Sequence, residues 1–375
     1  MWQPSSRYQY KESPQTNALG RKIPARGVRV PTIGIIDIIF AFIAVFADIY
    51  GFVVTIAQIR KGFNYRFYQY AVITWLIGLI EGITVSLGGI SSLLPSVEIS
   101  KMSEIFALGV NFFILLMYDA LKREQVDPVK VSAYLVLSAF VFFTMFNIPD
   151  WGTSPWALLY LVPESIPLIY SFYCSYLVVK RAPTALKRIS KVFATGAFLG
   201  LAAPVVSIIL WSEDWLLILV SLSVVMCVYA YIREPKLLFV LPFTALRLMV
   251  IDTSSGLALF NHTWNTDEKY IDDDIFSSLI QGLGLFAAKA IGKGQIREMA
   301  LDKATLIIHR LEGTNIACVV ITTRSSKTLR DALQIFTKKF SNRYKAELAA
   351  PSDTDQFAGA NALVEESFPF VPVYN

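Results

Sequence analysis

Histidine, cysteine and charged residues are all scarce in this chain. Its 375 residues include two histidines and three cysteines, and charged residues make up 17%. The cysteines form no CxxC pair, which argues against both a disulfide framework and a zinc site. The sequence also lacks a GxxxxGK(S/T) phosphate loop, an HExxH motif and kinase-like ATP motifs. Since His262 and His309 are the two histidines, a phosphohistidine relay is poorly supported, and we predict no catalytic residue, no metal and no cofactor.

Long apolar stretches dominate instead, because 54% of the residues are hydrophobic. Soluble domains carry nearer a quarter charged residues, and a helix needs about 20 apolar residues to cross a hydrocarbon core about 30 Å thick. By that rule we predict seven transmembrane helices, at 33–58, 68–92, 104–121, 130–148, 156–179, 190–211 and 215–232. The predicted domains are a flexible tail (1–30), a transmembrane domain (31–234), a short connection (235–245) and a C-terminal domain (246–375).

Basic residues alternate between the connections of the predicted bundle. The odd-numbered connections and the exit from the last helix carry Arg60, Lys61, Arg66, Lys122, Arg123, Lys130, Lys180, Arg181, Lys187, Arg188, Lys191, Arg233 and Lys236. The even-numbered connections carry Lys101, Asp150, Glu213 and Asp214. The positive-inside rule therefore places the C-terminal domain in the cytoplasm and the N-terminus outside. The same distribution accounts for the net charge of +5 without a nucleic-acid partner.

The basic tail before the first helix conflicts with this topology. Its charges are Arg21, Lys22, Arg26 and Arg29. Either this tail is tolerated outside the cell, or the first segment does not span the membrane. One conflict weighs less than six consistent connections, so we predict seven spans in the cell membrane.

Among the acidic residues inside the predicted spans, we single out four: Asp37, Asp48, Glu81 and Glu164. A charge at the centre of a bilayer costs about 2.5–3.5 kcal/mol on insertion scales, so such residues normally face the bundle interior and mark a pathway or ligand site. Asp37 and Asp48 are eleven residues apart, which returns them to nearly the same helix face. Together the four predict a cationic or protonatable site. The structural alternative is a neutral carboxylic acid that is hydrogen-bonded to a neighbouring helix.

Proline and glycine mark further positions in the spans. Pro163, Pro167 and Pro204 predict kinks beside a pocket, because proline removes a backbone donor from the helix. The pairs Gly78–Gly82 and Gly196–Gly200 permit close helix approach, which we interpret as packing inside the bundle rather than as a dimer contact.

The chain after Leu246 has the pattern of an α/β domain. Strand-like runs occur at 246–252, 257–264, 296–302, 304–311 and 315–323, with a turn predicted at 253–256. Helical spacing relates Ile275, Leu279, Leu283, Phe286 and Ala290 in one segment, and Leu329, Leu333, Phe336, Phe340 and Tyr344 in another. A last short helix is predicted over 353–368. The order β-β-α-β-β-β-α-α predicts a five-stranded antiparallel sheet with helices on one or both faces.

Three segments carry a family resemblance: VIDTSSGLALF, the helix around Ile275–Ile291, and VITTRSSKTLRDALQIFTKKF. Their order resembles the longin domain family. The join IREPKLLFVLPFTALRLMVID looks like that of archaeal membrane proteins that fuse a seven-span region to a longin-like domain. The seven-span region is distantly similar to the N-terminal region of some histidine kinases. The resemblance implies a non-catalytic platform that binds small GTPases, their regulators or another copy of itself.

We therefore expect a non-enzymatic, receptor-like protein of the lipid bilayer, whose cytoplasmic longin-like domain docks a protein partner. Self-association through that domain is a second expected interaction. Two alternatives stay open. One is a transporter or channel that uses the intramembrane carboxylates, although the spans show no evident inverted repeat. The other is a simple membrane anchor for the longin-like domain.

Overall fold

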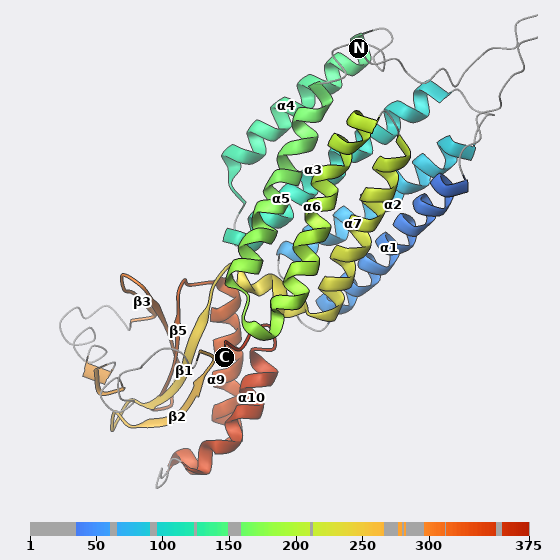
Figure 1. Cartoon of the computed structure of the whole chain (residues 1–375). Helices are drawn as coiled ribbons and strands as arrows, with labels where there is room; N and C mark the ends of the chain where they lie inside the picture. The colour runs from blue at the N-terminus through green and yellow to red at the C-terminus, as the bar shows by residue number, and fades with distance from the viewer. Residues whose placement is uncertain are drawn as a thin grey trace, which may run out of the picture. The chain divides into compact units, whose positions relative to one another are not determined.

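The computed structural model (Figure 1) describes residues 35–60, 66–90, 96–123, 126–148, 159–210, 213–265, 277–279, 281–282, 296–311, 313–349 and 355–374. The predicted tail over 1–30 and most of the predicted helix Ile275–Ile291 lie outside these residues. The chain divides into two compact units. The first contains residues 1–119, 126–173 and 195–229, and the second contains 120–125, 174–194 and 230–375.

Seven long helices occur within the described residues: α1 (Ile35–Arg60), α2 (Arg66–Ile90), α3 (Ser96–Arg123), α4 (Pro128–Asn147), α5 (Leu161–Arg181), α6 (Lys187–Leu210) and α7 (Glu213–Arg233). By length and composition, all of them except α5 could cross a membrane. Helix α5 is less apolar because it contains Glu164, two prolines and three tyrosines. The prediction of a multi-pass helical bundle is confirmed for six spans.

Helix α4 shows how local sequence sets a helix boundary. Asp127 is its N-cap, and the Asp127 side chain accepts a hydrogen bond of 3.0 Å from the backbone N–H of Val129. Pro128 occupies the first turn, where its missing N–H leaves no bond unmade. The helix packs on α3, since the Tyr134 hydroxyl donates to the carbonyl of Leu108 at 3.2 Å and its ring stacks on Phe112.

Glycines bring α6 and α7 into close contact. A Cβ atom at Gly196 would lie 2.9 Å from Cys227 Sγ and 3.1 Å from the carbonyl oxygen of Ser223. One turn later, a Cβ atom at Gly200 would lie 2.8 Å from Ser223 Oγ. Both positions therefore require glycine for the helices to approach this closely. The interpretation of this pair as packing inside the bundle is confirmed.

The C-terminal domain contains the predicted antiparallel sheet of five strands. They are β1 (Ala245–Asp252), β2 (Ala258–Thr263), β3 (Glu298–Ala300), β4 (Thr305–Arg310) and β5 (Ile316–Thr322). The order across the sheet is β2-β1-β5-β4-β3, with antiparallel pairing throughout. The strands β1 and β5 lie next to each other in the interior of the sheet and are almost entirely buried. This explains their nearly continuous apolar sequences.

The two faces of the sheet are both buried. On one face, Phe260 of β2 contacts Phe336 and Phe340 of helix α9 (Lys327–Arg343). The opposite face carries a buried apolar cluster of Met249, Ile251, Leu306, Ile308, Ala317 and Val319. Successive residues of a strand point to opposite faces, so residues that point toward this cluster alternate along β1, β4 and β5 with residues that point toward the α9 face.

Helix α9 confirms the predicted amphipathic stripe. Leu329, Leu333, Phe336, Phe340 and Tyr344 are all buried. The side chain of Ser326 caps the helix by accepting a 3.0 Å hydrogen bond from the backbone N–H of Leu329. The predicted last helix is present as a short 3₁₀ turn, η7 (Asp355–Ala360), that continues into α10 (Asn361–Ser367). In the segment predicted as a helix around Ile275–Ile291, the described residues 277–279 and 281–282 are helical, and Leu279 is 55% exposed.

The turn between β1 and β2 forms where the sequence predicts it. Its first residue, Asp252, accepts hydrogen bonds from the hydroxyls of Ser254 and Ser255 and from the backbone N–H of Ser254. Gly256 has φ +77°, a left-handed conformation that glycine adopts without strain. Burial alone would raise the pKa of Asp252, but the hydrogen bonds from Ser255 and Ser254 hold it below its usual value.

Replacing Gly196 tests the α6–α7 contact. In G196A the added methyl group meets a sulfur atom and a backbone carbonyl, so we expect the full-length protein in nanodiscs to lose about 1–3 kcal/mol of stability. The control is G109A, where a Cβ atom would meet Ile77 at an ordinary 3.5 Å. Thermal unfolding followed by circular dichroism measures both. Equal melting temperatures for the two variants would contradict the close approach.

The Asp252 turn predicts an acid-sensitive stability of the sheet domain. The folded pKa of Asp252 lies below the unfolded value of about 3.9, so the stabilisation is complete above about pH 4 and disappears as the pH falls through the folded pKa. Hydrogen exchange of β1 and β2 in the full chain, followed from neutral to acidic pH, should show a steeper acid loss in the wild type than in D252N. The control D331N changes an exposed aspartate of α9 and should keep the wild-type profile.

Candidate functional site

The predicted intramembrane carboxylates lie on three helices of the first unit. Asp48 is on α1, Glu81 is on α2, and Glu164 is in the first turn of α5. Asp37 is part of α1 as well, but its side chain lies outside the described residues. Asp48 is the most deeply buried of the three described side chains, with 8% of its surface exposed.

A seam of small residues places Asp48 against α2. A Cβ atom at Gly78 would lie 3.3 Å from Asp48 Oδ2, and one at Gly82 would lie 2.8 Å from Val45 Cγ2. On the other side of Asp48, a Cβ atom at Gly51 would lie 2.9 Å from the ring of Trp75. Glycine at position 78 therefore leaves the space that the Asp48 carboxylate occupies. The interpretation of the Gly78–Gly82 pair as packing inside the bundle is confirmed.

Electrostatic interactions join the three carboxylates into one acidic group. Glu81 interacts with both Asp48 and Glu164, and Glu164 interacts with Glu104 of α3. Next to them, the Tyr160 hydroxyl donates a 3.3 Å hydrogen bond to the backbone carbonyl of Glu104. The sequence predicts three members of this group. It misses Glu104, which stands at the first position of a predicted span and is indistinguishable there from a boundary residue.

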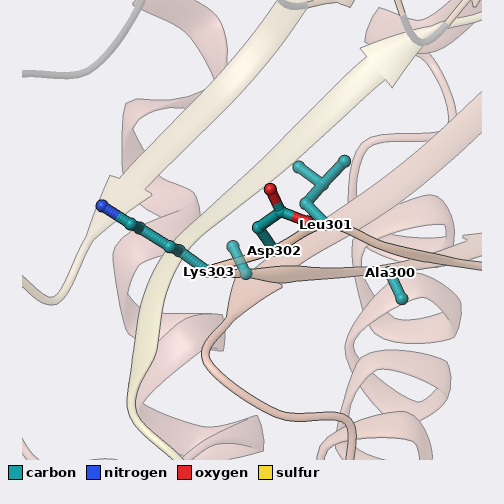
Figure 2. Close-up of a pocket in the computed structure, with 5 residues that line it drawn as sticks. Ala300, Leu301, Asp302 and Lys303 are labelled. Atoms are coloured by element: carbon teal, nitrogen blue, oxygen red, sulfur yellow. The ribbon is translucent and has the colours of Figure 1, made fainter.

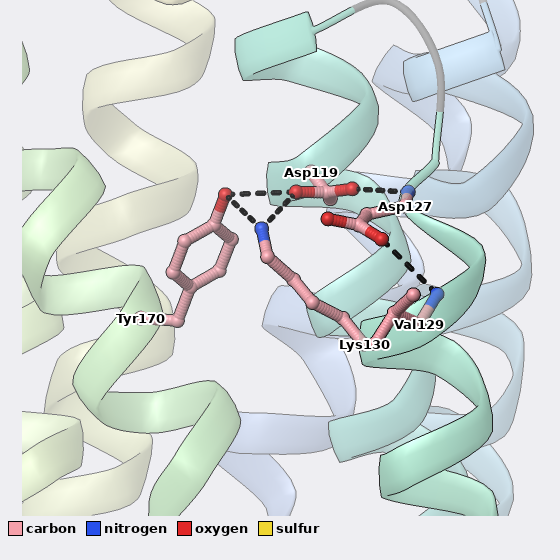
Figure 3. A network of polar contacts seen from close by, with 5 residues as sticks. All are labelled: Asp119, Asp127, Val129, Lys130 and Tyr170. Atoms are coloured by element: carbon pink, nitrogen blue, oxygen red, sulfur yellow. Dashed lines mark hydrogen bonds and ion pairs between the residues drawn. The ribbon is translucent and has the colours of Figure 1, made fainter.

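A second polar network in the bundle was not predicted at all (Figure 3). Asp119 of α3 is 1% exposed and accepts three hydrogen bonds. Lys130 Nζ donates at 2.6 Å and Tyr170 of α5 donates at 3.0 Å, both to Oδ1, while the backbone N–H of Asp127 donates to Oδ2 at 2.6 Å. Lys130 Nζ also lies 4.7 Å from the centre of the Tyr170 ring. A signal existed in the sequence, because Asp119 is an acid inside the third predicted span.

This network joins three helices through a neutralised charge pair. Asp119 has a positive counter-charge and full hydrogen bonding, which is the condition under which a buried carboxylate is tolerated. Its chemistry is therefore that of a structural clamp between α3, α4 and α5. The acidic group around Glu81 differs, since its described electrostatic interactions are with other acids and tyrosines.

The three predicted proline positions do not act alike. Pro163 is the third residue of α5, in the first turn, so it removes no hydrogen bond within the helix. Pro167 and Pro204 lie inside α5 and α6 and do remove one each. The pocket predicted beside them stays a prediction.

The described residues show little on the C-terminal domain that suggests chemistry. A shallow depression follows the β3–β4 turn and is lined by Ala300, Leu301, Asp302, Lys303 and Ala304 (Figure 2). The turn is closed by a 2.7 Å hydrogen bond from the N–H of Leu301 to the carbonyl of Ala304. Across the described part of the chain, no three His, Cys, Asp or Glu side chains are grouped so that they could hold a metal ion.

The connection after α7 is packed rather than extended. A 3₁₀ turn, η4 (Pro235–Val240), leads into β1, and the residues Leu237, Leu238, Phe239, Val240, Leu241 and Phe243 are buried. Within the same compact unit, Arg181 at the end of α5 donates a 3.3 Å hydrogen bond from Nη1 to the carbonyl of Leu241. Phe239 and Phe243 both contact the ring of Phe370, close to the C-terminus.

Removing the counter-charge of Asp119 should destabilise the bundle. In K130M the buried carboxylate loses a charged donor, so we expect the free energy of unfolding in nanodiscs to fall by about 1.5–3 kcal/mol. Y170F removes one neutral donor and should cost about 0.5–1.5 kcal/mol. The control is K187M, which removes an exposed lysine at the start of α6. If K130M and K187M unfold at the same temperature, the clamp contributes nothing to the stability of the bundle.

Comparison with known proteins gives no match: no protein-family model, no curated protein and no solved structure is similar to this chain.

Proposed function

We propose that this protein is a receptor-like membrane protein in which the state of the helical bundle controls a C-terminal docking domain. In this proposal α5 is a seventh span, the N-terminus is outside and the C-terminal domain is cytoplasmic. The alternation of basic residues between connections supports the orientation. The strand order and helix α9 support a longin-like domain, and the resemblance to that family supports a non-enzymatic role with a small GTPase or its regulator as partner.

The observation that carries the proposal is the packed connection between α7 and β1. A simple tether needs no fixed conformation, and flexible linkers are typically polar and exposed. Here six apolar side chains of the connection are buried, and a hydrogen bond from Arg181 holds its backbone. A displacement at the end of α5 or α7 would therefore move Leu241 and, four residues later, the start of β1.

A displacement of β1 would affect the rest of the sheet because of the position of this strand. It pairs with β2 on one side and with β5 on the other. Strand β5 in turn leads directly into helix α9, whose outer face is exposed to partners. Because packed layers transmit shifts rather than absorb them, a movement of β1 would alter the surface of the domain.

The acidic group in the bundle also favours a second candidate, a transporter or channel with a regulatory domain. Carboxylates inside a bundle often mark an ion or proton pathway. Cation or proton flux into proteoliposomes that is lost in E81Q would support this candidate. The anchor alternative predicts that exchanging the bundle for an unrelated span leaves partner docking unchanged.

The connection can be tested without knowing the natural ligand, because bilayer thickness is a physical input to any bundle. We expect hydrogen exchange of residues 235–252 to differ between nanodiscs of short-chain and long-chain lipids. In R181M this difference should fall by at least half, because the connection loses its hydrogen bond to α5. The control R188M removes an exposed arginine of the same α5–α6 region and should respond like the wild type.

A second variant replaces 236–243 by glycine and serine and should abolish the response. Identical responses in the wild type, R181M and the glycine–serine variant would contradict transmission through the connection and favour a simple anchor. If hydrogen exchange of residues 235–252 in the wild type is the same in short-chain and long-chain lipids, that result would contradict receptor-like behaviour of the bundle.

A further inference from the structure

Asp48 has no hydrogen-bond or ion-pair partner among the described residues, although more than nine-tenths of its surface is buried. Its carboxylate lies in the space left by Gly78, within one turn of Glu81 on the same helix. An acid in this position is costly unless something neutralises it, because the bilayer interior and the helices around it solvate charge poorly.

The described groups that interact electrostatically with Asp48 or with its acidic neighbours are acids and phenols. Glu81 comes from α2, Glu164 from α5 and Glu104 from α3. Tyr160 and Tyr134 complete the set of coupled groups. Lys130, a basic residue of the described bundle, pairs with Asp119 instead. Asp48, Glu81 and Glu164 therefore have like charges as their described electrostatic neighbours.

Like charges that interact in a poorly solvating medium do not all stay ionised, and each one that is neutralised eases the ionisation of the others. A metal ion would need at least three of these side chains grouped as ligands, and the described residues contain no such group. A proton needs a single oxygen and no added space. The proton is therefore the ligand that fits the tight Asp48–Gly78 contact.

We propose that Asp48, Glu81 and Glu164 form a proton-binding centre whose occupancy changes with pH and is the signal that the bundle reads. Binding converts a carboxylate and a proton into a neutral carboxylic acid, with no other bond made or broken. The first half of this inference, reversible protonation, stands alone. The second half, that protonation is the signal, rests on the proposed function.

Infrared difference spectroscopy of the full-length protein in nanodiscs tests the centre directly, through the carbonyl stretch of protonated carboxylic acids. We expect the wild type to show a buried carboxylic-acid band that titrates with pH. In D48N and E81Q the band should lose the contribution of the mutated residue. In D48N the midpoint of the remaining band should also shift to lower pH, because one like charge is gone. D119N is the matched control, an acid of the same bundle that has its own counter-charge, and it should keep the titrating band.

Three outcomes would overturn the centre: no titrating band in the wild type, a band unchanged in both D48N and E81Q, or a band removed by sodium or potassium at constant pH. The last result would identify a cation site instead.

Circular dichroism of each variant confirms that the helices are intact. Hydrogen exchange of residues 235–252 in the same samples separates this inference from the proposed function. A titrating band without any change in hydrogen exchange of the connection supports the proton-binding centre and contradicts the receptor proposal. A change in hydrogen exchange with bilayer thickness but no titrating band supports the receptor proposal and contradicts the centre.

Discussion

The exclusion of water from the bilayer is the constraint on which this structure depends. It forces backbone polar groups into helices, and it forces every acid within the bundle to find a counter-charge, hydrogen bonds or a proton. The bundle contains both kinds of solution. Asp119 is held by Lys130, Tyr170 and a backbone N–H, whereas Asp48 lies against Gly78 with the acid Glu81 as its described electrostatic neighbour. The first arrangement is that of a structural clamp, and the second is the one for which we propose a change of charge.

A change of charge in a bundle has an effect elsewhere if a rigid path carries it. In the proposed function the connection after α7 is this path, and its buried apolar side chains and the hydrogen bond from the end of α5 support that role. The aromatic contacts of Phe239 and Phe243 with Phe370 add the C-terminal segment to the same packed core. The path leads into β1, an interior strand of the sheet that is paired on both sides.

The sequence predicts most of the fold because the signals are local. Apolar runs of membrane-spanning length, strand-like runs separated by turn residues, and the stripe from Leu329 to Tyr344 each depend on spacing along one segment. The glycine pairs are equally readable, since close approach leaves few other choices. The Asp119–Lys130–Tyr170 network was missed because its members come from three segments, and a lysine at a helix end reads as a topology marker. Pro163 was predicted inside a helix that begins at residue 156. Helix α5 begins at Leu161 instead, so Pro163 lies in its first turn.

The central claim is that the bundle and the C-terminal domain change state together. Spin labels at Arg66, an exposed residue at the start of α2, and at Lys345, an exposed residue after α9, report on the two units separately. The native cysteines at 174 and 318 are buried, and the half-buried Cys227 is replaced by serine in both labelled proteins. Double electron–electron resonance in nanodiscs then gives the distribution of distances between the labels. The account predicts that this distribution shifts between thin and thick bilayers in the wild type and not in R181M. Superimposable distributions in every lipid and for both proteins would contradict it.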